Sequence, residues 1–249
     1  MAFSGVIVNA KIMVGGLNLS GNSNSLAVAY GAEMLDNTVF QEGAGSRTRS
    51  FTPGLKTVGV TAQMFWDTVK DQVLFGRIGI ASDVVTVADI GETEGDRVFF
   101  VKGVHGAYNP VSGEIGQLIS ANLDLKSTNS PLVRGQLMAR GSKVASGNSV
   151  GINMGSAEGK RIYSALHIIT PLVAGGGGEQ IIGTIESDDN APFATPTTRL
   201  THATLTAMGA DWQEASIGAG ITDNFWRAKW VIAGAAPDFD IYWSFGILG

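Results

Sequence analysis

The chain has 249 residues, no cysteine, and a formal net charge of −5 from 17 basic and 22 acidic residues. The lack of cysteine excludes disulfides and thiolate metal sites, and an acidic balance without clustered lysine and arginine argues against a DNA-gripping surface. Hydrophobic residues make up 44% of the chain, which is enough for a packed core, and 34 glycines indicate many turns.

The first two predicted strands occupy residues 6–14 and 26–30. Gly15-Gly16 ends the first, and a turn-rich segment leads into the second, so we expect the two to form a hairpin or a long ribbon. The opening residues lack a basic region followed by an unbroken apolar stretch, which predicts no signal peptide. No window approaches the ~18 apolar residues of a membrane helix, so we expect a chain that is soluble at synthesis.

Residues 36–52 interrupt this pattern with a long polar segment. Most connections run about 4–6 residues, and a loop this long is usually functional or disordered. It carries Arg47, Arg49 and Phe51, which suit a protein interface; a mobile surface loop with solvated charges is the alternative. Pro53-Gly54 predicts a turn at its end.

A strand and the chain's one convincing helix follow. Residues 58–64 alternate strictly between apolar and small or polar side chains, which predicts a strand. Residues 68–78 are expected to be helical, with Asp67 as N-cap and Gly79 as the end. Trp66, Val69 and Val73 share one face, which we expect to pack on a sheet.

Three further strands complete the first half. They are expected at residues 83–87, 97–104 and 119–125, with an acidic turn at 91–96 and a turn-rich loop at 106–116. One helix among so many strands predicts a β-sandwich with a single covering helix.

Short pieces of this half form a recognisable series: a polar turn at 20–25, the segment AEMLDNT at 32–38, the long loop, PGLK at 53–56, and FWD at 65–67. Together they resemble the opening of the tail tube proteins of long-tailed bacteriophages, over roughly residues 1–126. The resemblance implies a subunit whose inner sheet joins those of its neighbours into a closed β-barrel ring of six or pseudo-six copies. Stacked rings would form a tube in the virion tail, through which DNA passes during ejection.

The same resemblance implies the partners and the contact residues. The chain would assemble in the host cytoplasm with itself and with other tail proteins, without membrane contact and without specific DNA binding. The loop at 36–52 would make the stacking and subunit contacts. The candidate contact residues are Arg47, Arg49, Phe51, Asp36 and Gly54.

Residues 126–131 are a small, polar segment ending in proline, which predicts a boundary between a domain at 1–130 and one at 131–249. Strands are expected at 132–139, 162–169, 181–186, 225–232 and 239–247, which indicates a C-terminal β-sandwich or jelly-roll-like domain. In the last strand, Phe239, Ile241, Trp243 and Phe245 share one face, as a core strand requires. We expect this half to decorate the tube exterior; a second tube-forming domain is the alternative.

Several motifs suggest chemistry but lack its context. Ser149 is the central residue of a sequence that matches the nucleophile-elbow motif, but the buried strand that this motif requires does not precede it. Residues 155–161 resemble a phosphate loop whose glycine spacing is one residue short. Residues 186–190 cluster oxygen atoms without the spacing of an EF-hand, so we expect a solvated turn, with a calcium site as the alternative.

The histidines and the aromatic-basic segment have simpler interpretations. His105, His167 and His202 are too far apart for a local metal motif, and His167 is expected to be a hydrogen-bonded structural residue. Residues 225–230 could stack nucleotides, but alternation places Trp226 and Trp230 on a core face, opposite Arg227 and Lys229.

We expect no enzyme: no catalytic residue, cofactor or metal. The alternative function is a capsid decoration or receptor-facing module that binds carbohydrate or protein.

Overall fold

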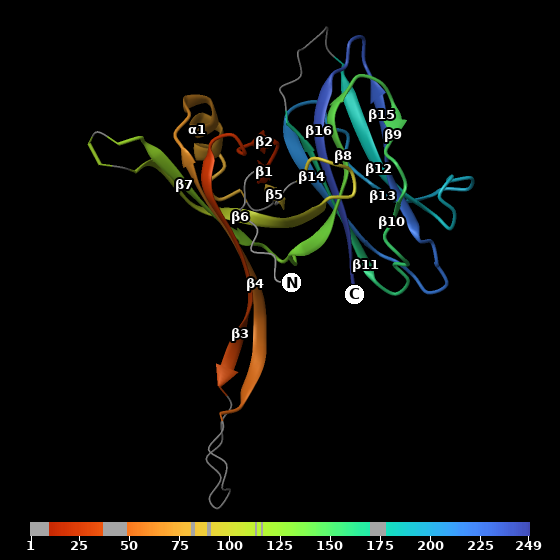
Figure 1. Ribbon diagram of the computed structural model, residues 1–249, viewed down its shortest axis with the longest axis horizontal. Coiled ribbons are helices and arrows are strands. Elements are labelled where there is room, and N and C mark those ends of the chain that lie inside the picture. The colour runs from red at the N-terminus through yellow and green to blue at the C-terminus, as the bar shows by residue number, and fades with distance from the viewer. Residues whose placement is uncertain are drawn as a thin grey trace, which may run out of the picture.

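The computed structural model describes residues 10–36, 49–80, 83–88, 91–112, 114–115, 117–169 and 178–249. Over these residues the chain is mainly β, which confirms the predicted fold class, and a single α-helix of eight residues accompanies the strands. This described part contains no helix with the length and apolar character needed to cross a membrane. Figure 1 shows a body of packed strands from which one hairpin, β3–β4, projects.

The elements follow one another in this order. The first half holds β1 (Lys11–Val14), β2 (Leu17–Asn18), β3 (Ser23–Asp36), β4 (Phe51–Phe65), α1 (Thr68–Phe75), β5 (Asp83–Ala88), β6 (Arg97–Ser112) and β7 (Ser120–Ser127). The second half holds β8 (Val133–Lys143), β9 (Gly147–Asn148), β10 (Ile152–Asn153), β11 (Arg161–Ile168), β12 (Gln180–Asp188), β13 (Thr197–Thr201), β14 (Gly209–Ser216), β15 (Phe225–Ala233) and β16 (Phe239–Leu248).

One eleven-stranded sheet runs through both halves, because the long strand β6 pairs with strands from each. Its first part pairs with β5 on one edge and with β8 on the other, where Phe100 lies opposite Val133. Its second part pairs with β7, along the same edge as β8. Residues 126–131 therefore connect two strands that lie end to end along β6, and the domain division at residue 130 remains a prediction.

Three apolar clusters hold these strands together. The first lies inside the curled N-terminal part and contains Val60, Leu74 and Leu123. The second lies where the halves meet and contains Phe100 of β6 and Tyr163 of β11. The third fills the C-terminal sandwich. Each is built from the buried faces of alternating strands, as period-two side-chain spacing requires.

A second sheet, of β9, β10, β12, β13 and β15, covers the C-terminal part of the large sheet. Trp226 stacks on Phe245 between the two sheets, with ring centroids 5.0 Å apart. The predicted core strand is confirmed as β16, and Trp243 is fully buried. Tyr242 on the opposite face of β16 is buried as well, because that face packs into the junction between the halves.

The helix begins where the sequence predicts and ends earlier. Asp67 accepts hydrogen bonds from the backbone N–H groups of Val69 and Lys70, at 3.0 and 3.2 Å, which confirms the N-cap. The helix ends at Phe75 rather than at residue 78. The predicted packing face is only partly right. Val73 packs against the N-terminal core beside the buried Leu74, whereas Val69 is 72% exposed and Trp66 is 39% exposed.

Three other expectations need correction. Pro53-Gly54 forms no turn: both residues lie inside β4, where no described strand pairs with the edge away from β3, and such an edge tolerates proline. β1 pairs with β2 and β5, and β3 pairs with β4, so over their described residues the first two predicted strands form neither a hairpin nor a ribbon with each other. Residues 106–112 continue β6 instead of forming a loop.

Candidate subunit-contact surface

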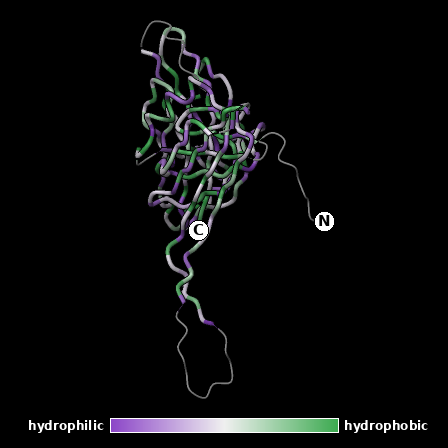
Figure 2. Tube along the Cα trace, turned by 90° about the vertical axis from the view of Figure 1, so that its left-hand side faces the viewer, coloured by the Kyte–Doolittle hydropathy of each residue, from purple (hydrophilic) through white to green (hydrophobic). Residues whose placement is uncertain are grey.

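Strands β3 and β4 extend beyond the body as a two-stranded arm. β4 pairs with β7 only from Gly59 to Phe65, so residues 51–57 and their partners in β3 have no other strand beside them in the described chain. Figures 1 and 2, a quarter-turn apart, both show this arm standing clear of the body. At about 3.3 Å per residue it extends roughly 20 Å. An isolated two-stranded ribbon is at best marginally stable in water, so a partner surface would stabilise it.

Four of the five predicted contact residues lie on or next to the far part of this arm. Phe51 is 45% exposed and lies opposite Asp36, which is also exposed. Arg49 is exposed just before β4, and Gly54 lies within β4. Arg47 lies outside the described residues. The structure therefore gathers these four residues, but on a strand pair instead of an irregular loop.

The arm also exposes large apolar side chains that the sequence interpretation did not single out. Leu55 is 78% exposed and Met34 is 58% exposed. Phe51, Pro53 and Met34 share one face of the arm, because Met34 lies opposite Pro53. A bulge in β4 between Pro53 and Lys56 breaks the alternation, so Leu55 does not share that face. We call Phe51, Pro53, Leu55 and Met34 the arm strip. Exposed apolar side chains gathered on one segment mark interaction sites on soluble proteins.

The strands of the arm continue into a four-stranded unit whose two outer edges are unpaired over part of their length in the described chain. The strand order is β3-β4-β7-β6, and in the described chain β3 pairs only with β4. β5 covers one edge of β6 only as far as Gly103, and a single bridge from Ile78 to His105 continues it. Residues 106–112 of β6 therefore have no strand on that edge among the described residues. Open strand edges are templates for pairing with another chain.

The two faces of this four-stranded unit differ sharply. One face buries Val60, Leu123 and their neighbours in the N-terminal core. The other face carries small and uncharged polar side chains in cross-strand rows, with Asp124 and Lys126 as its charged members on β7. The rows join Ser25, Gln63, Asn122 and Asn109, and then Ala27, Thr61, Asp124 and Ala107. These residues surround a shallow, open hollow of about 320 Å³.

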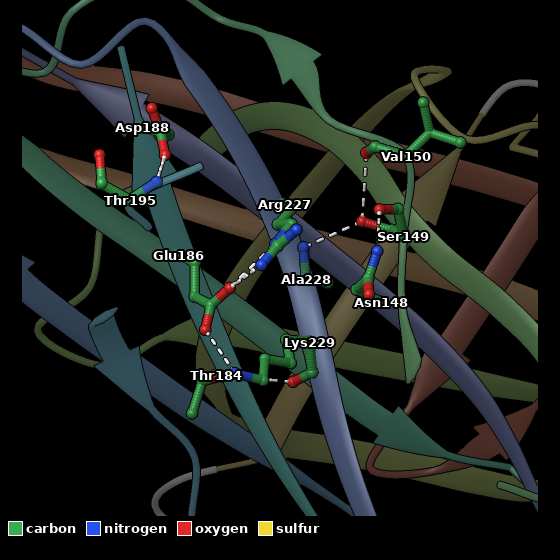
Figure 3. A network of polar contacts seen from close by, with 10 residues as sticks. All are labelled: Asn148, Ser149, Val150, Thr184, Glu186, Asp188, Thr195, Arg227, Ala228 and Lys229. Atoms are coloured by element: carbon green, nitrogen blue, oxygen red, sulfur yellow. Dashed lines mark hydrogen bonds and ion pairs between the residues drawn. The ribbon is translucent and has the colours of Figure 1, made fainter. Parts of the chain in front are cut away.

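Neither Ser149 nor the acidic cluster forms a chemical site (Figure 3). Ser149 is 4% exposed; its Oγ accepts a hydrogen bond from the Ala228 N–H at 2.9 Å and donates to the Val150 carbonyl at 3.3 Å. Glu186 accepts from Arg227 at 2.7 Å and from Lys229 at 2.9 Å. Burial raises the pKa of Glu186, but these two cations outweigh it and lower the pKa overall.

The remaining acidic oxygens are also engaged in the fold. Asp188 accepts from the backbone N–H groups of Asn190 and Thr195, at 2.9 and 2.8 Å, and so closes the turn after β12. Within the residues that the structure describes, no three His, Cys, Asp or Glu side chains are grouped so that they could hold a metal ion. The predicted core position of Trp226 and Trp230 is confirmed, since both are buried.

His167 is a buried structural residue, as predicted. Its Nδ1 accepts from the Gly16 N–H at 3.3 Å, and its Nε2 donates to Thr86 Oγ1 at 2.9 Å. Burial lowers the pKa of His167 from 6.5 to about 3, so the ring is neutral at pH 7. The imidazole of His167, on β11, thus links the second half of the chain to the β1–β2 turn and to β5 in the first half.

A Ser-His-Asp arrangement is present that the sequence did not reveal. His202 Nδ1 donates to Asp211 at 2.8 Å, and its Nε2 lies 2.9 Å from Ser164 Oγ. Hydrolytic triads have this order of contacts. Here Ser164 is fully buried between the sheets and also accepts from the Trp243 indole at 2.8 Å. A substrate could reach it only if the sandwich opened, so we interpret the group as a polar clamp between the sheets.

Comparisons with known proteins give weak likenesses only. No family model matches the chain, and no curated protein matches it. A virion structure of a native gene transfer agent particle matches 49% of this chain and 94% of its own, at 11% identity and a TM-score of 0.37. The tail of an empty gene transfer agent particle, with C6 symmetry, matches 53% and 98%, at 14% identity and 0.36.

A third solved structure covers nearly the whole chain. The crystal structure of SPP1 Dit (gp 19.1), described as a paradigm of the hub adsorption apparatus in phages that infect Gram-positive hosts, matches 95% of this chain and 98% of its own. Its identity is 11% and its TM-score 0.37. At these scores none of the likenesses carries a functional argument, which must come from the geometry above.

Proposed function

We propose that this chain is a structural subunit of a long-tailed phage, whose copies close into rings that stack into the tail tube. The observation that carries the proposal is the pair of unpaired margins on opposite sides of the β3-β4-β7-β6 unit. The sequence resemblance over residues 1–126 supports the same function.

The strand directions suit ring closure. Each neighbouring pair in the four-stranded unit is antiparallel, so β3 and β6 run in opposite directions. β3 of one copy can therefore lie antiparallel to β6 of the next and continue the same alternation around a ring. Closing a sheet on itself removes its edges, which explains how a chain with two open margins avoids indefinite aggregation.

The polar face then lines the channel. The apolar face of the unit is covered by its own core, so the face with Gln63, Asn122 and Asp124 is the one left to face inward. DNA-binding surfaces gain affinity mainly by releasing counterions from phosphates with clustered cations. A lining of mostly amides, hydroxyls and methyl groups, in which Lys126 is balanced by Asp124, offers little of that affinity, so DNA can pass without being held.

The arm makes the contacts that join subunits. Phe51, Leu55 and Met34 would be covered by a neighbouring copy, and Arg49 and Asp36 would lie at the rim of that contact. The C-terminal half, which is attached through the first part of β6, would decorate the exterior of the tube.

The test is assembly of the full-length chain with and without residues 41–50. We expect concentrated intact protein to form hollow rods in negative-stain electron micrographs, because the open margins pair. The amides of residues 106–112 that point away from β7 should exchange with solvent rapidly in the dilute monomer and slowly in rods. The deleted chain should keep its circular dichroism spectrum but form no rods.

Deletion of the four glycines 175–178, in a different loop, is the matched control and should leave the rods intact. Rods that survive the 41–50 deletion would discard the role of the arm. A protein that stays monomeric at every concentration, with residues 106–112 already protected, would discard the proposed ring.

A further inference from the structure

Helix α1 buries Leu74 and packs Val73 against the N-terminal core, but it leaves its other two apolar side chains exposed. Val69 is 72% exposed and Phe75 is 67% exposed, whereas the charged residues of the same helix are engaged with the body. Lys70 Nζ bonds to Asn22, and Asp71 accepts from the Tyr108 hydroxyl at 2.8 Å. A surface helix usually carries polar side chains outside the stripe that faces the core. The outward face of α1 is therefore suited to contact another surface.

Neighbouring segments enlarge this apolar face. The Trp66 N–H donates to the Ile119 carbonyl at 3.0 Å, which joins the start of the helix to the start of β7. Trp66 is 39% exposed, Ile119 48% and Leu118 74%. We call Trp66, Val69, Phe75, Ile78, Leu118 and Ile119 the α1-end patch. Exposed apolar residues gathered in this way mark a docking surface.

The α1-end patch and the arm lie at opposite ends of one strand. β4 begins at Phe51 on the arm and ends at Phe65, directly before Trp66. Its 15 residues span about 50 Å at 3.3 Å each. Figure 1 shows α1 and the arm at opposite ends of β4. A second copy displaced along the strand direction would therefore bring its arm to the α1 end of the first.

The occupant that fits this patch is the arm of a second copy. The arm strip and the α1-end patch are both apolar and uncharged, and the same chain presents one of each. The arm lacks a third strand, so it gains order from a surface that covers it. A contact between different surfaces of identical subunits does not close on itself and propagates along an axis.

We propose that the α1-end patch is the socket that receives the β3–β4 arm of a subunit in the adjacent ring. This inference rests on the proposed tube, and it assigns the stacking contact to residues on both sides. Lateral pairing of strand margins would build each ring, and the arm in its socket would join one ring to the next.

Engineered cysteines provide the test, because the chain has none of its own. Leu55→Cys on the arm and Val69→Cys on α1 replace exposed residues, so neither change disturbs a core. After mild oxidation of the full-length proteins, a mixture of the two single variants should give a cross-linked dimer. The L55C/V69C double variant should give a ladder of longer oligomers. Val231→Cys, exposed on β15, is the control and should not cross-link to L55C.

Other outcomes separate the inference from the proposed function. Rods or rings that form without the L55C–V69C cross-link, or with L55C joined only to itself, would overturn the socket and leave the ring proposal standing. Failure of the unmodified protein to form rings or rods would overturn the proposed function instead. A V69E/F75E variant should lose at least ten-fold in rod yield while single rings persist, and unchanged rods in that variant would also overturn the socket.

Discussion

His167 shows how a single side chain fixes the relation between the two halves. Its two hydrogen bonds, to Gly16 and Thr86, require one tautomer of the neutral ring, with the proton on Nε2. Protonation would place a hydrogen on Nδ1, where the Gly16 N–H already points. Asp83 favours the charged ring, whereas Arg77 and His202 oppose it, and burial is the largest effect. The charged form is therefore strongly disfavoured in the folded chain.

This makes stability depend on pH in a predictable direction. The folded pKa of His167, about 3, lies below the unfolded value of 6.5, so the unfolded chain binds more protons between these pH values. The contribution is complete above pH 6.5 and falls by up to about 1.4 kcal/mol per pH unit toward pH 3. Urea unfolding at pH 7, 5.5 and 4 should show the stability gap between the parent and His167→Gln narrowing as pH falls. A constant gap would contradict the assignment.

Ser149 offers a second prediction at this scale, with a control that accepts from the same strand, β15. Ser149→Ala leaves the buried Ala228 N–H without its acceptor and should lower the free energy of unfolding by about 1–3 kcal/mol. Ser146 Oγ accepts from the Ile232 N–H in the same way but is exposed, so water replaces it in Ser146→Ala and the cost should be near zero. Equal costs in chemical denaturation would refute this account.

Individual elements were predictable from sequence where local chemistry decides them. β7, β16 and the part of β4 from Val58 onward show strict alternation, and Asp67 is placed to cap α1, so each of these could be placed without a structure. β14 has no such pattern: apart from Trp212 its residues are small or polar, and its existence depends on pairing with β11 along its full length. Propensity is a weak guide where the tertiary context supplies the stabilisation.

The candidate contact surface was predictable only in part, for the same reason. The polar segment at 36–52 indicated an interface, and Phe51 and Arg49 are exposed there. The sequence could not show that β3 and β4 pair far beyond β7, because that pairing is a property of two distant segments. The arm strip and the outward face of α1 could not be predicted either. An apolar residue type does not show whether its side chain is exposed or belongs to the core.

At the scale of the whole molecule, the two halves share a sheet and a core. β6 carries β7 and β8 along one edge, and the junction cluster draws on both halves. Phe100 of β6 contacts Trp212 of β14 edge-to-face, with ring centroids 5.5 Å apart. A boundary at residue 130 that separated independent domains would leave Phe100 and its neighbours uncovered. Burial at the junction therefore favours unfolding as one unit.

Phe100→Ala tests this cooperativity. The side chain is fully buried, so its removal should cost about 3–5 kcal/mol through lost burial and a residual cavity. If the halves unfold together, amide exchange protection in β4 and β7 and in the more distant β12 and β15 should fall by the same free energy. Val231→Ala, at an exposed position in β15, should change neither set. Loss of protection confined to the first half would instead establish two independent domains, divided near residue 130.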